Sequence, residues 1–588
     1  MIMTEEREKF PEIRFSSDFE ISKNAPFKTV DEFVDAVGHL ITPDMMVMRV
    51  TESLCPICVD DEKFDQMRIP AIVYENAGEV KLIKECHEHG ITREKYWEDY
   101  EMYQEAKKWQ DPGVKILNPH VAYLESKIVC PTHCGLCIKH KSHTGLGNVV
   151  VTNRCDLSCW YCFFYAKSGE PIYEPSIEEL DKLFLNLRSQ KPIPANALQL
   201  TGGEPTMHPK IVEIVALAKK RGFDQIQLNT TGINLGFNPK LAEDLRKAGV
   251  STLYMSFDGV SKRANPKNHW EVPLTLKAAR KAGIGVVLVP TVIKSINDNE
   301  LGQMVNFGLN NIDIVRAVNF QPVSLVGRMP KRQRQTQRIT IPGTIKKIEE
   351  QTNGVISKED WFSVPCIGDI TKFLEAASGA YKYDLSIHFA CGTGTYLFLD
   401  SGNKVIPITR FIDVEGLVEH FRQGYNEMDG KPRLIRKAIA MKYILKLPSF
   451  IDTAKQPKSV NALSLLTSVF AKRTFNSLAK LQMKTLFLGI MHFQDEYTYD
   501  IHRVEKCDIH YAMPDGEVLP FCTFNVLPEI YRDKIQNQYS IPEKEWMASH
   551  KDWTYSKDKY IRNVKDLEAR KEYAETYGNL TDYFKKAD

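Results

Sequence analysis

Three cysteines in the string CDLSCWYC are the clearest sign of chemistry in this chain. Cys155, Cys159 and Cys162 directly follow a short β-branched run, so one loop after a strand can bring three thiolates together. A 4Fe-4S cubane takes four protein thiolates when it only stores electrons. Three thiolates leave one iron open, and an open iron can bind a small molecule. The spacing alone also fits a chance match or a structural zinc loop.

A second motif stands one strand and one helix further along the chain. The string TGGEP ends the next predicted strand, so Gly202, Gly203 and Glu204 should lie beside the cysteine loop. Taken alone, such a string is an ordinary tight turn. Its position directly after the cysteine loop, in a succession of strands and helices, favours a shared site.

Further polar residues stand at the ends of the following predicted strands. Asn229 and Thr230 end the third strand, and Ser256 and Asp258 belong to the string SFDG after the fourth. Each of them could equally be a strand-end cap or a turn residue.

Together these features resemble the radical SAM (S-adenosylmethionine) superfamily, including an aromatic residue, Tyr161, just before the last cysteine. The resemblance implies that the three cysteines hold a 4Fe-4S cluster and that the GGE motif receives the methionine amine of SAM. It implies that Asn229 and Thr230 contact SAM and that Ser256 and Asp258 lie at a ribose-binding position. It also implies reductive cleavage of SAM to a 5'-deoxyadenosyl radical, while the protein positions the substrate and excludes water. Catalytic acids and bases are not assignable.

The fifth and sixth predicted strands offer candidates for packing the adenine of SAM. They are Val289 on the fifth strand and Phe320 or Gln321 after the sixth. Plain core packing is an equal alternative for each of these side chains.

Six more cysteines precede the loop. Cys55 and Cys58 form one CxxC knuckle and Cys134 and Cys137 another, and paired knuckles are the usual cage for zinc or a single rubredoxin-like iron. We expect the two knuckles to share one mononuclear metal, with either a structural role or a role in electron delivery. Two remaining cysteines could belong to a further cluster, which would need either histidine ligands or a different sharing of the knuckles; the residues concerned are Cys86, Cys130, His87, His89, His133, His140 and His143.

Four cysteines follow the predicted strands: Cys366, Cys391, Cys507 and Cys522. Their number is that of a fully ligated auxiliary 4Fe-4S cluster. Scattered cysteines are more often buried small side chains, but three of these stand in turn-like strings. We therefore expect an auxiliary cluster, which makes two or three clusters in all.

The elements that position these residues predict an α/β fold. From about residue 147, six β-branched strands alternate with helices, which indicates a parallel sheet with right-handed crossovers. We expect a partial (β/α)6 radical SAM barrel at 145–330. An N-terminal Cys-rich metal-binding module should precede it at 1–144, and a C-terminal auxiliary iron-sulfur domain should follow it at 331–588.

The composition is that of an ordinary folded protein. Its 588 residues are 43% hydrophobic and 26% charged, and the net charge of +2 offers no general attraction to nucleic acid. The sequence has no secretory signal and no long apolar run, so we expect a cytoplasmic protein. Residues 431–484 are basic and amphipathic, which fits either contact with a membrane surface or an ordinary helix pair.

A closer resemblance covers about residues 45–530. The strings CPIC, CPTHCGLC, MHFQDEY, RVEKCDIHY and PDGEVLPFCTFN resemble the archaeal radical SAM tetraether lipid synthase family, which was described earlier as a pterin-methylating group. This resemblance implies carbon–carbon bond formation between isoprenoid chains, with an isoprenoid diether lipid as substrate and an electron donor such as ferredoxin. One alternative is methylation of a pterin, and another is an iron-sulfur electron carrier. A lipid enzyme needs a long apolar tunnel, whereas a pterin enzyme needs a short polar pocket.

Overall fold

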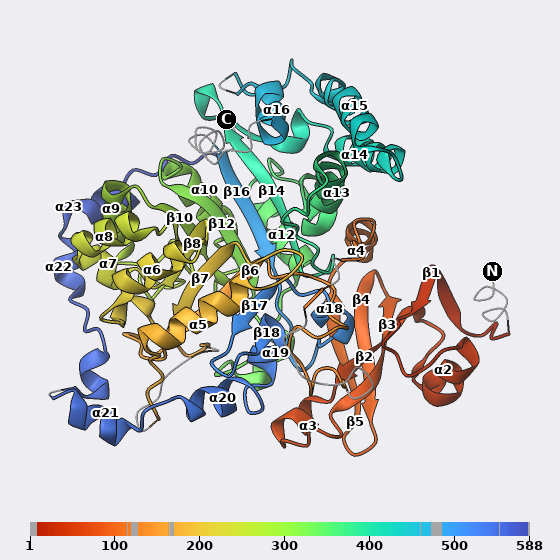
Figure 1. The fold of residues 1–588 in the computed structure, drawn as a ribbon, viewed down its shortest axis with the longest axis horizontal. Coiled ribbons are helices and arrows are strands. Elements are labelled where there is room, and N and C mark those ends of the chain that lie inside the picture. The colour runs from red at the N-terminus through yellow and green to blue at the C-terminus, as the bar shows by residue number, and fades with distance from the viewer. Residues whose placement is uncertain are drawn as a thin grey trace.

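The computed structural model describes residues 9–113, 116–118, 128–162, 164, 170–458, 460–471, 485–551 and 553–585. A small N-terminal β-sheet stands at one side of a larger sheet that is covered by helices (Figure 1). The C-terminal segment returns to both parts, because it supplies strands to the large sheet and lies against the small one.

Six parallel strands form the centre of the large sheet, which confirms the predicted α/β fold. These strands are β6 (Leu146–Thr152), β7 (Ala197–Gly202), β8 (Gln225–Thr230), β9 (Thr252–Ser256), β10 (Gly285–Val289) and β12 (Val315–Pro322). The helices between them are α5 (Ile177–Arg188), α6 (Ile211–Lys220), α8 (Pro239–Ala248), α9 (Val272–Ala282) and α10 (Leu301–Asn310).

Local sequence sets the ends of these helices. At the start of α5, Ser176 and Glu179 form a reciprocal capping box that satisfies two free backbone N–H groups. Helix α8 begins with the cap Asn238 followed by a proline, and it ends at Gly249, whose φ of +134° suits only glycine.

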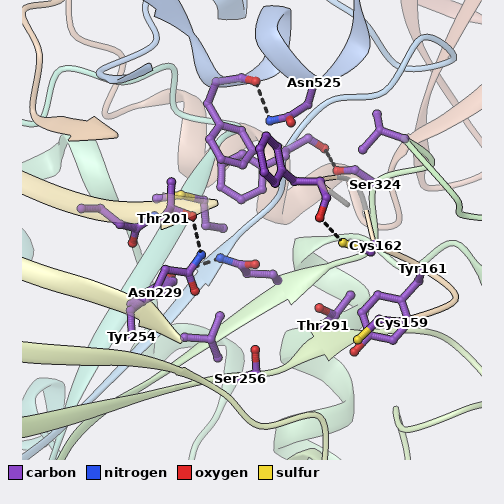
Figure 2. Close-up of a pocket in the computed structure, with 18 of the residues that line it drawn as sticks. Cys159, Tyr161, Cys162, Thr201, Asn229, Tyr254, Ser256, Thr291, Ser324 and Asn525 are labelled. Carbon is purple, nitrogen blue, oxygen red and sulfur yellow. Dashed lines mark hydrogen bonds between the residues drawn. The ribbon is translucent and has the colours of Figure 1, made fainter. Parts of the chain in front are cut away.

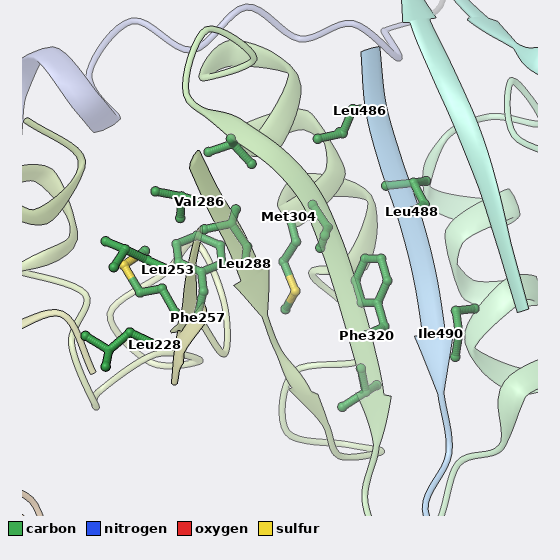
Figure 3. Packing of buried hydrophobic residues seen from close by; sticks show 14 of the residues in the cluster. Leu228, Leu253, Phe257, Val286, Leu288, Met304, Phe320, Leu486, Leu488 and Ile490 are labelled. Carbon is green, nitrogen blue, oxygen red and sulfur yellow. The ribbon is translucent and has the colours of Figure 1, made fainter. Parts of the chain in front are cut away.

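The helices cover the outer face of the sheet, and the main hydrophobic core lies between the two layers. Strand residues such as Leu228, Leu253 and Leu288 point to this face and belong to the same buried cluster as Met304 of α10 (Figure 3). Side chains on a strand alternate between the two faces. The residues directly before and after each leucine on its strand therefore point to the opposite face of the sheet.

C-terminal strands extend the sheet at both edges. Strand β16 (Thr485–Met491) pairs in parallel with β12, and β17 (Ile509–Ala512) pairs in parallel with β6. Beyond them lie β14 (Gly392–Leu399) and β18 (Val518–Pro520). Residue 330 therefore does not separate two sheets, because the segment predicted as a C-terminal domain completes the sheet begun by the central one.

The N-terminal module is a five-stranded sheet in the order β1-β2-β3-β4-β5. Its strands are β1 (Arg14–Ile21), β2 (Met46–Leu54), β3 (Arg68–Asn76), β4 (Glu79–Cys86) and β5 (Gly90–Trp97). Strands β3 and β4 are joined by a tight hairpin at Ala77 and Gly78, both of which have positive φ angles. Helix α2 (Val30–Val37) packs on one face of the sheet.

A buried ion pair joins this module to the C-terminal segment. Arg49 of β2 and Asp500 are both almost fully buried, and the guanidinium binds the carboxylate through two nitrogens. Asp500 also accepts hydrogen bonds from Thr51 (2.9 Å) and Tyr96 (3.1 Å). Burial alone would raise the pKa of Asp500, but Arg49, the charge of His502 and the Thr51 hydroxyl hold it well below its ordinary value.

The basic segment at 431–484 is only partly within the described residues, because 472–484 lie outside them. Its described part contains α15 (Arg433–Ile444) and α16 (Ala462–Ala471), which adjoin α13 (Gly368–Ser378) and α14 (Val414–Met428). Tyr443 faces this cluster, while Leu434 is 81% exposed. In the described ranges, no helix has the length and apolar character needed to cross a bilayer.

We predict that Arg49→Leu destabilises the protein by about 3–5 kcal/mol, because it leaves the Asp500 carboxylate buried without its counter-charge. Arg14→Leu, at an exposed position of β1, is the matched control and should change stability little. Anaerobic urea unfolding followed by tryptophan fluorescence measures both variants. Equal midpoints for the two variants would show that the buried pair contributes nothing.

Candidate functional site

The cysteine loop after β6 and the glycines after β7 lie in direct backbone contact. Gly203 N donates to Thr152 O at 2.9 Å, and Glu204 N donates to Arg154 O at 2.8 Å. A Cβ on Gly202 would lie 2.0 Å from Thr152 O, and one on Gly203 would lie 2.0 Å from Arg154 O. The two glycines are therefore required for steric reasons, because any side chain would push the cysteine loop away.

The C-terminal tail also holds the cysteine loop, which the sequence did not indicate. Lys559 donates to the carbonyl oxygens of Cys155 (2.7 Å) and Leu157 (2.9 Å). Arg154 forms a two-nitrogen ion pair with Asp558, at 2.9 Å for both bonds. A segment 400 residues away in the sequence thus fixes the loop, and no local pattern announces such a contact.

A cavity of about 380 Å³ lies at the carboxyl ends of the strands (Figure 2). The three loop cysteines reach it together, as the sequence predicts. The other predicted residues that line it are Tyr161, Gly202, Gly203, Asn229, Ser256, Val289 and Gln321. Burial raises the pKa of all three thiols, to about 11 for Cys162. Metal binding would favour their thiolate forms.

Glu204 does not line the cavity. Its side chain is fully buried and accepts hydrogen bonds from Thr206 N (3.0 Å), Thr206 Oγ1 (2.6 Å), Thr230 Oγ1 (2.8 Å) and Thr231 N (2.7 Å). In this structure the carboxylate ties the end of β8 to the turn after β7. Its predicted contact with the methionine amine stays a prediction.

Asp258 lies just behind the cavity wall. It accepts a short hydrogen bond from the Tyr161 hydroxyl, a bond from Thr291 N at 3.0 Å and an ion pair from Lys267 at 3.2 Å. Lys267 lines the cavity, and its positive charge lowers the pKa of the Cys159 thiol against the larger effect of burial. Lys267 was not predicted from the sequence. Its ammonium group at the cavity suits a carboxylate such as that of methionine.

The prediction that Phe320 packs the adenine of SAM is wrong. Its side chain is fully buried in the main core on the helix-covered face of β12, so it is not available to pack an adenine (Figure 3). The neighbouring residues Asn319 and Gln321 line the cavity instead. The physical reason is the two-residue period of a strand, which sends Phe320 to the opposite face from its neighbours.

The inward-facing residues of four strands form two polar layers. We define the layers by position along each strand: the upper layer, nearest the strand ends, holds Thr201, Asn229, Ser256 and Gln321, and the lower layer, two residues earlier on each strand, holds Gln199, Gln227, Tyr254 and Asn319. The strands are staggered, so Tyr254 of the lower layer lies opposite Asn229 of the upper layer. The lower layer was missed by the sequence reasoning. Polar residues at every second position, as in the strings LQLT and QIQLN, were the available signal.

A second candidate site lies in the N-terminal module. The ligand atoms of Cys55, Cys58, Cys86 and His89 all lie within 4.8 Å of one another. Cys58 Sγ is 3.8 Å from Cys86 Sγ, and His89 Nδ1 is 3.4–3.5 Å from all three sulfurs. A tetrahedral ion with bonds of about 2.3 Å to sulfur places its ligands at about this separation. The group therefore fits one metal ion and not a cubane.

The predicted sharing of two knuckles is wrong, because hairpin β4–β5 supplies the partners of Cys55 and Cys58. Cys134 and Cys137 lie instead with Cys130, in a second string with the CxxxCxxC spacing. The Cys134 thiol forms a hydrogen bond with the Cys130 thiol and another, at 3.6 Å, with Thr523 Oγ1. These three thiols are left as a separate candidate cluster site.

Three of the four C-terminal cysteines lie together. Burial raises the pKa of Cys507, and the charges of Cys522 and Cys391 raise it further. Arg503 donates to Cys391 Sγ at 3.3 Å, and Cys522 lines the main cavity. The charge that acts on Cys366 is that of Asp369, not of a thiol.

This fold and cysteine site define a radical SAM protein. The model of the radical SAM superfamily matches residues 149–308, and that of the "HMPTM N-terminal zinc ribbon domain" matches residues 47–98. The first range holds the cysteine loop and strands β7 to β10, and β12 lies outside it. The second holds all four ligands of the mononuclear metal site.

Over 510 residues the chain is 41% identical to 7,8-dihydro-6-hydroxymethylpterin dimethyltransferase of Methanocaldococcus jannaschii. This match covers 85% of the chain and 97% of the relative. The chain belongs to the family of this protein. It is also 27% identical over 294 residues to GTP 3',8-cyclase of Geobacter sulfurreducens, covering 46% of this chain and 86% of the relative. Methylornithine synthase, a solved structure, is 15% identical with a TM-score of 0.24, and the match covers 30% of this chain and 53% of that one.

The prediction of tetraether lipid synthesis is therefore wrong, and so is the isoprenoid diether lipid as partner. The relative that is matched along 97% of its length carries the name of a pterin dimethyltransferase. This finding favours the pterin-methylating alternative, and it removes the reason for expecting a membrane partner at the basic segment.

We predict that Gly203→Ala displaces the cysteine loop, because its Cβ would lie 2.0 Å from Arg154 O. The variant should lose about four irons per chain and all SAM cleavage. Gly285→Ala in β10 is the control, because its nearest neighbour, 3.1 Å away, is the flexible side chain of Arg316. Iron analysis and assay of 5'-deoxyadenosine test the pair, and full iron content in Gly203→Ala would contradict the steric argument.

We predict that Cys58→Ser removes roughly one metal ion per chain while the iron-sulfur absorbance stays, because the mononuclear site is separate from the other thiols. Ile57→Ser, at the exposed neighbouring position, should keep the ion. Elemental analysis by mass spectrometry counts the metals. Retention of the ion in Cys58→Ser would exclude this site.

Proposed function

We propose that this chain is a radical SAM methyltransferase that acts on a pterin of the 6-hydroxymethyl-7,8-dihydropterin type. The observation that carries the proposal is the 41% identity to a pterin dimethyltransferase along 97% of its length. The cavity of about 380 Å³ supports it, because amide and hydroxyl groups from the strands stand beside aromatic and aliphatic side chains in its lining. Such a lining suits a small heteroaromatic ring better than an alkyl chain.

The residues that would hold the cofactors are those that meet at the cavity. Cys155, Cys159 and Cys162 would ligate a 4Fe-4S cluster, and Lys267 would face the carboxylate of SAM. Bound there, the cluster and SAM would supply one-electron chemistry and a 5'-deoxyadenosyl radical. Gly202 and Gly203 keep the cysteine loop close, so the ligands stay in place.

The other metal sites would serve this centre. The set Cys55, Cys58, Cys86 and His89 is typical of zinc, in keeping with the ribbon domain that contains it. The two further thiol groups, one around Cys134 and one around Cys507, would hold auxiliary iron-sulfur clusters. An external donor such as ferredoxin would reduce the chain.

We predict that the anaerobically reconstituted and reduced protein, given SAM and 6-hydroxymethyl-7,8-dihydropterin, forms 5'-deoxyadenosine and binds the pterin. If all co-reactants are present, as in an extract from the source cells, the pterin should gain one or two methyl groups. Liquid chromatography with mass spectrometry follows both products.

The control is the triple variant Cys155→Ala, Cys159→Ala, Cys162→Ala, which should form neither product. Deoxyadenosine formation without any binding of the pterin by the wild type would refute the proposed substrate, while leaving the radical SAM assignment intact.

A further inference from the structure

The lower polar layer of the cavity has no role in the function described so far. Gln199, Gln227, Tyr254 and Asn319 point inward from β7, β8, β9 and β12, two residues below the predicted SAM contacts. Polar side chains in a barrel interior are costly unless each finds a partner. Their hydrogen bonds therefore show which groups remain for a ligand.

The glutamine amides all point in the same direction. Gln227 Nε2 donates to Gln199 Oε1 at 2.6 Å, and Gln199 Nε2 donates to Asn148 Oδ1 at 2.7 Å. Each amide thus donates toward β6. Gln227 Oε1, the acceptor of the first amide in this series of hydrogen bonds, has no hydrogen-bond donor among the residues that the structure describes. It is a free acceptor at the cavity wall.

Tyr254 presents the opposite polarity. Its hydroxyl oxygen accepts from Asn319 Nδ2, in a short bond, and from Gln321 Nε2 at 3.1 Å. A hydroxyl has two lone pairs and one proton, so both lone pairs are used. Burial raises the pKa of Tyr254 to about 12, so the proton stays on at neutral pH. Within the described part of the chain this proton has no acceptor, which leaves a free donor at the cavity.

The free donor and the free acceptor are neighbours. Strands β8 and β9 pair in parallel with Asn229 opposite Tyr254, and Gln227 precedes Asn229 by two residues on the same face. Figure 2 shows Tyr254 beside Asn229 at one wall of the cavity. The free acceptor and the free donor therefore lie on adjacent strands and face the same cavity, displaced by two residues along the strands.

The cavity also offers flat apolar surfaces. Phe493 and Phe521 line it with rings stacked at 4.0 Å, and Tyr511 lies next to Phe521 with its centroid at 5.6 Å. Such rings suit the face of a planar heterocycle, while the wall at Tyr254 suits an edge. The two surfaces together select a flat ring with a polar edge.

We propose that Gln227 and Tyr254 read the lactam edge of the substrate, the ring N–H beside its carbonyl group. Gln227 Oε1 accepts from the N–H, and the Tyr254 hydroxyl donates to the carbonyl oxygen. This inference rests on the proposed pterin substrate, because a pterin carries such an edge on its pyrimidine ring. The adenine of SAM offers an amino group beside a ring nitrogen, which is the alternative that the test must separate.

The test compares two ligands that differ in this edge. 6-Hydroxymethylpterin has the ring N–H and carbonyl, whereas 2,4-diamino-6-hydroxymethylpteridine has an amino group in place of the carbonyl and no N–H beside it. Their binding to the cluster-loaded full chain is measured by ligand fluorescence, and SAM binding by calorimetry. The variants are Tyr254→Phe, Gln227→Leu and, as control, Tyr381→Phe at a 63% exposed position.

We expect Tyr254→Phe to weaken 6-hydroxymethylpterin about tenfold, through the loss of one hydrogen bond to a buried carbonyl. Binding of the diamino compound and of SAM should not change, and Tyr381→Phe should match the wild type. Gln227→Leu should show the same selectivity, which keeps the test valid if one variant fails to take up iron. Equal weakening of both pteridines, or weakening of SAM instead, would overturn the inference. If the wild type binds neither pteridine, the proposed function itself fails.

Discussion

The carboxylate of Asp500 is the group on which much of the structure depends. It is completely buried, and it stays charged because Arg49, Thr51 and Tyr96 all donate to it. These three donors lie on strands of the N-terminal sheet, whereas Asp500 belongs to the segment that follows β16. A buried carboxylate without them would be costly. The N-terminal module and the large sheet are therefore obliged to fold against each other.

The segment that ends at Asp500 also forms part of the cavity. Asp500 N donates to Gln494 Oε1 at 2.7 Å, and Gln494 N donates to Cys522 Sγ at 3.4 Å. Gln494 and Cys522 both line the cavity. The same segment also contacts the N-terminal module. Lys84 of β4, two residues before the candidate metal ligand Cys86, donates to Glu496 O at 2.8 Å. The metal-binding hairpin and the cavity are thus connected through one short stretch of backbone.

Local patterns predicted those cavity residues that stand at the ends of successive strands. Cys155 and Gly203 follow β6 and β7, Asn229 lies near the end of β8, and parallel strands bring these ends together. The N-terminal metal site was not predictable in this way, because spacing could not tell whether Cys58 pairs with Cys134 or with Cys86. The choice depends on the β4–β5 hairpin. The same holds for strands β16 and β17, which join the sheet at opposite edges through contacts distant in sequence.

Strand parity accounts for the remaining error and also bears on the substrate. Phe320 and Gln321 differ by one position, and the pairing of β12 with β10 and β16 fixes which of them faces the cavity. Gln321 faces the cavity, as do Tyr254 and Gln227 on neighbouring strands. Tyr254 and Gln227 each keep one hydrogen-bonding group that could pair with a ligand. An alkyl chain in this cavity would leave both groups unsatisfied, at about 1–3 kcal/mol each. The proposed heterocycle with a lactam edge would remove that penalty, because its ring N–H and its carbonyl would pair with the two groups.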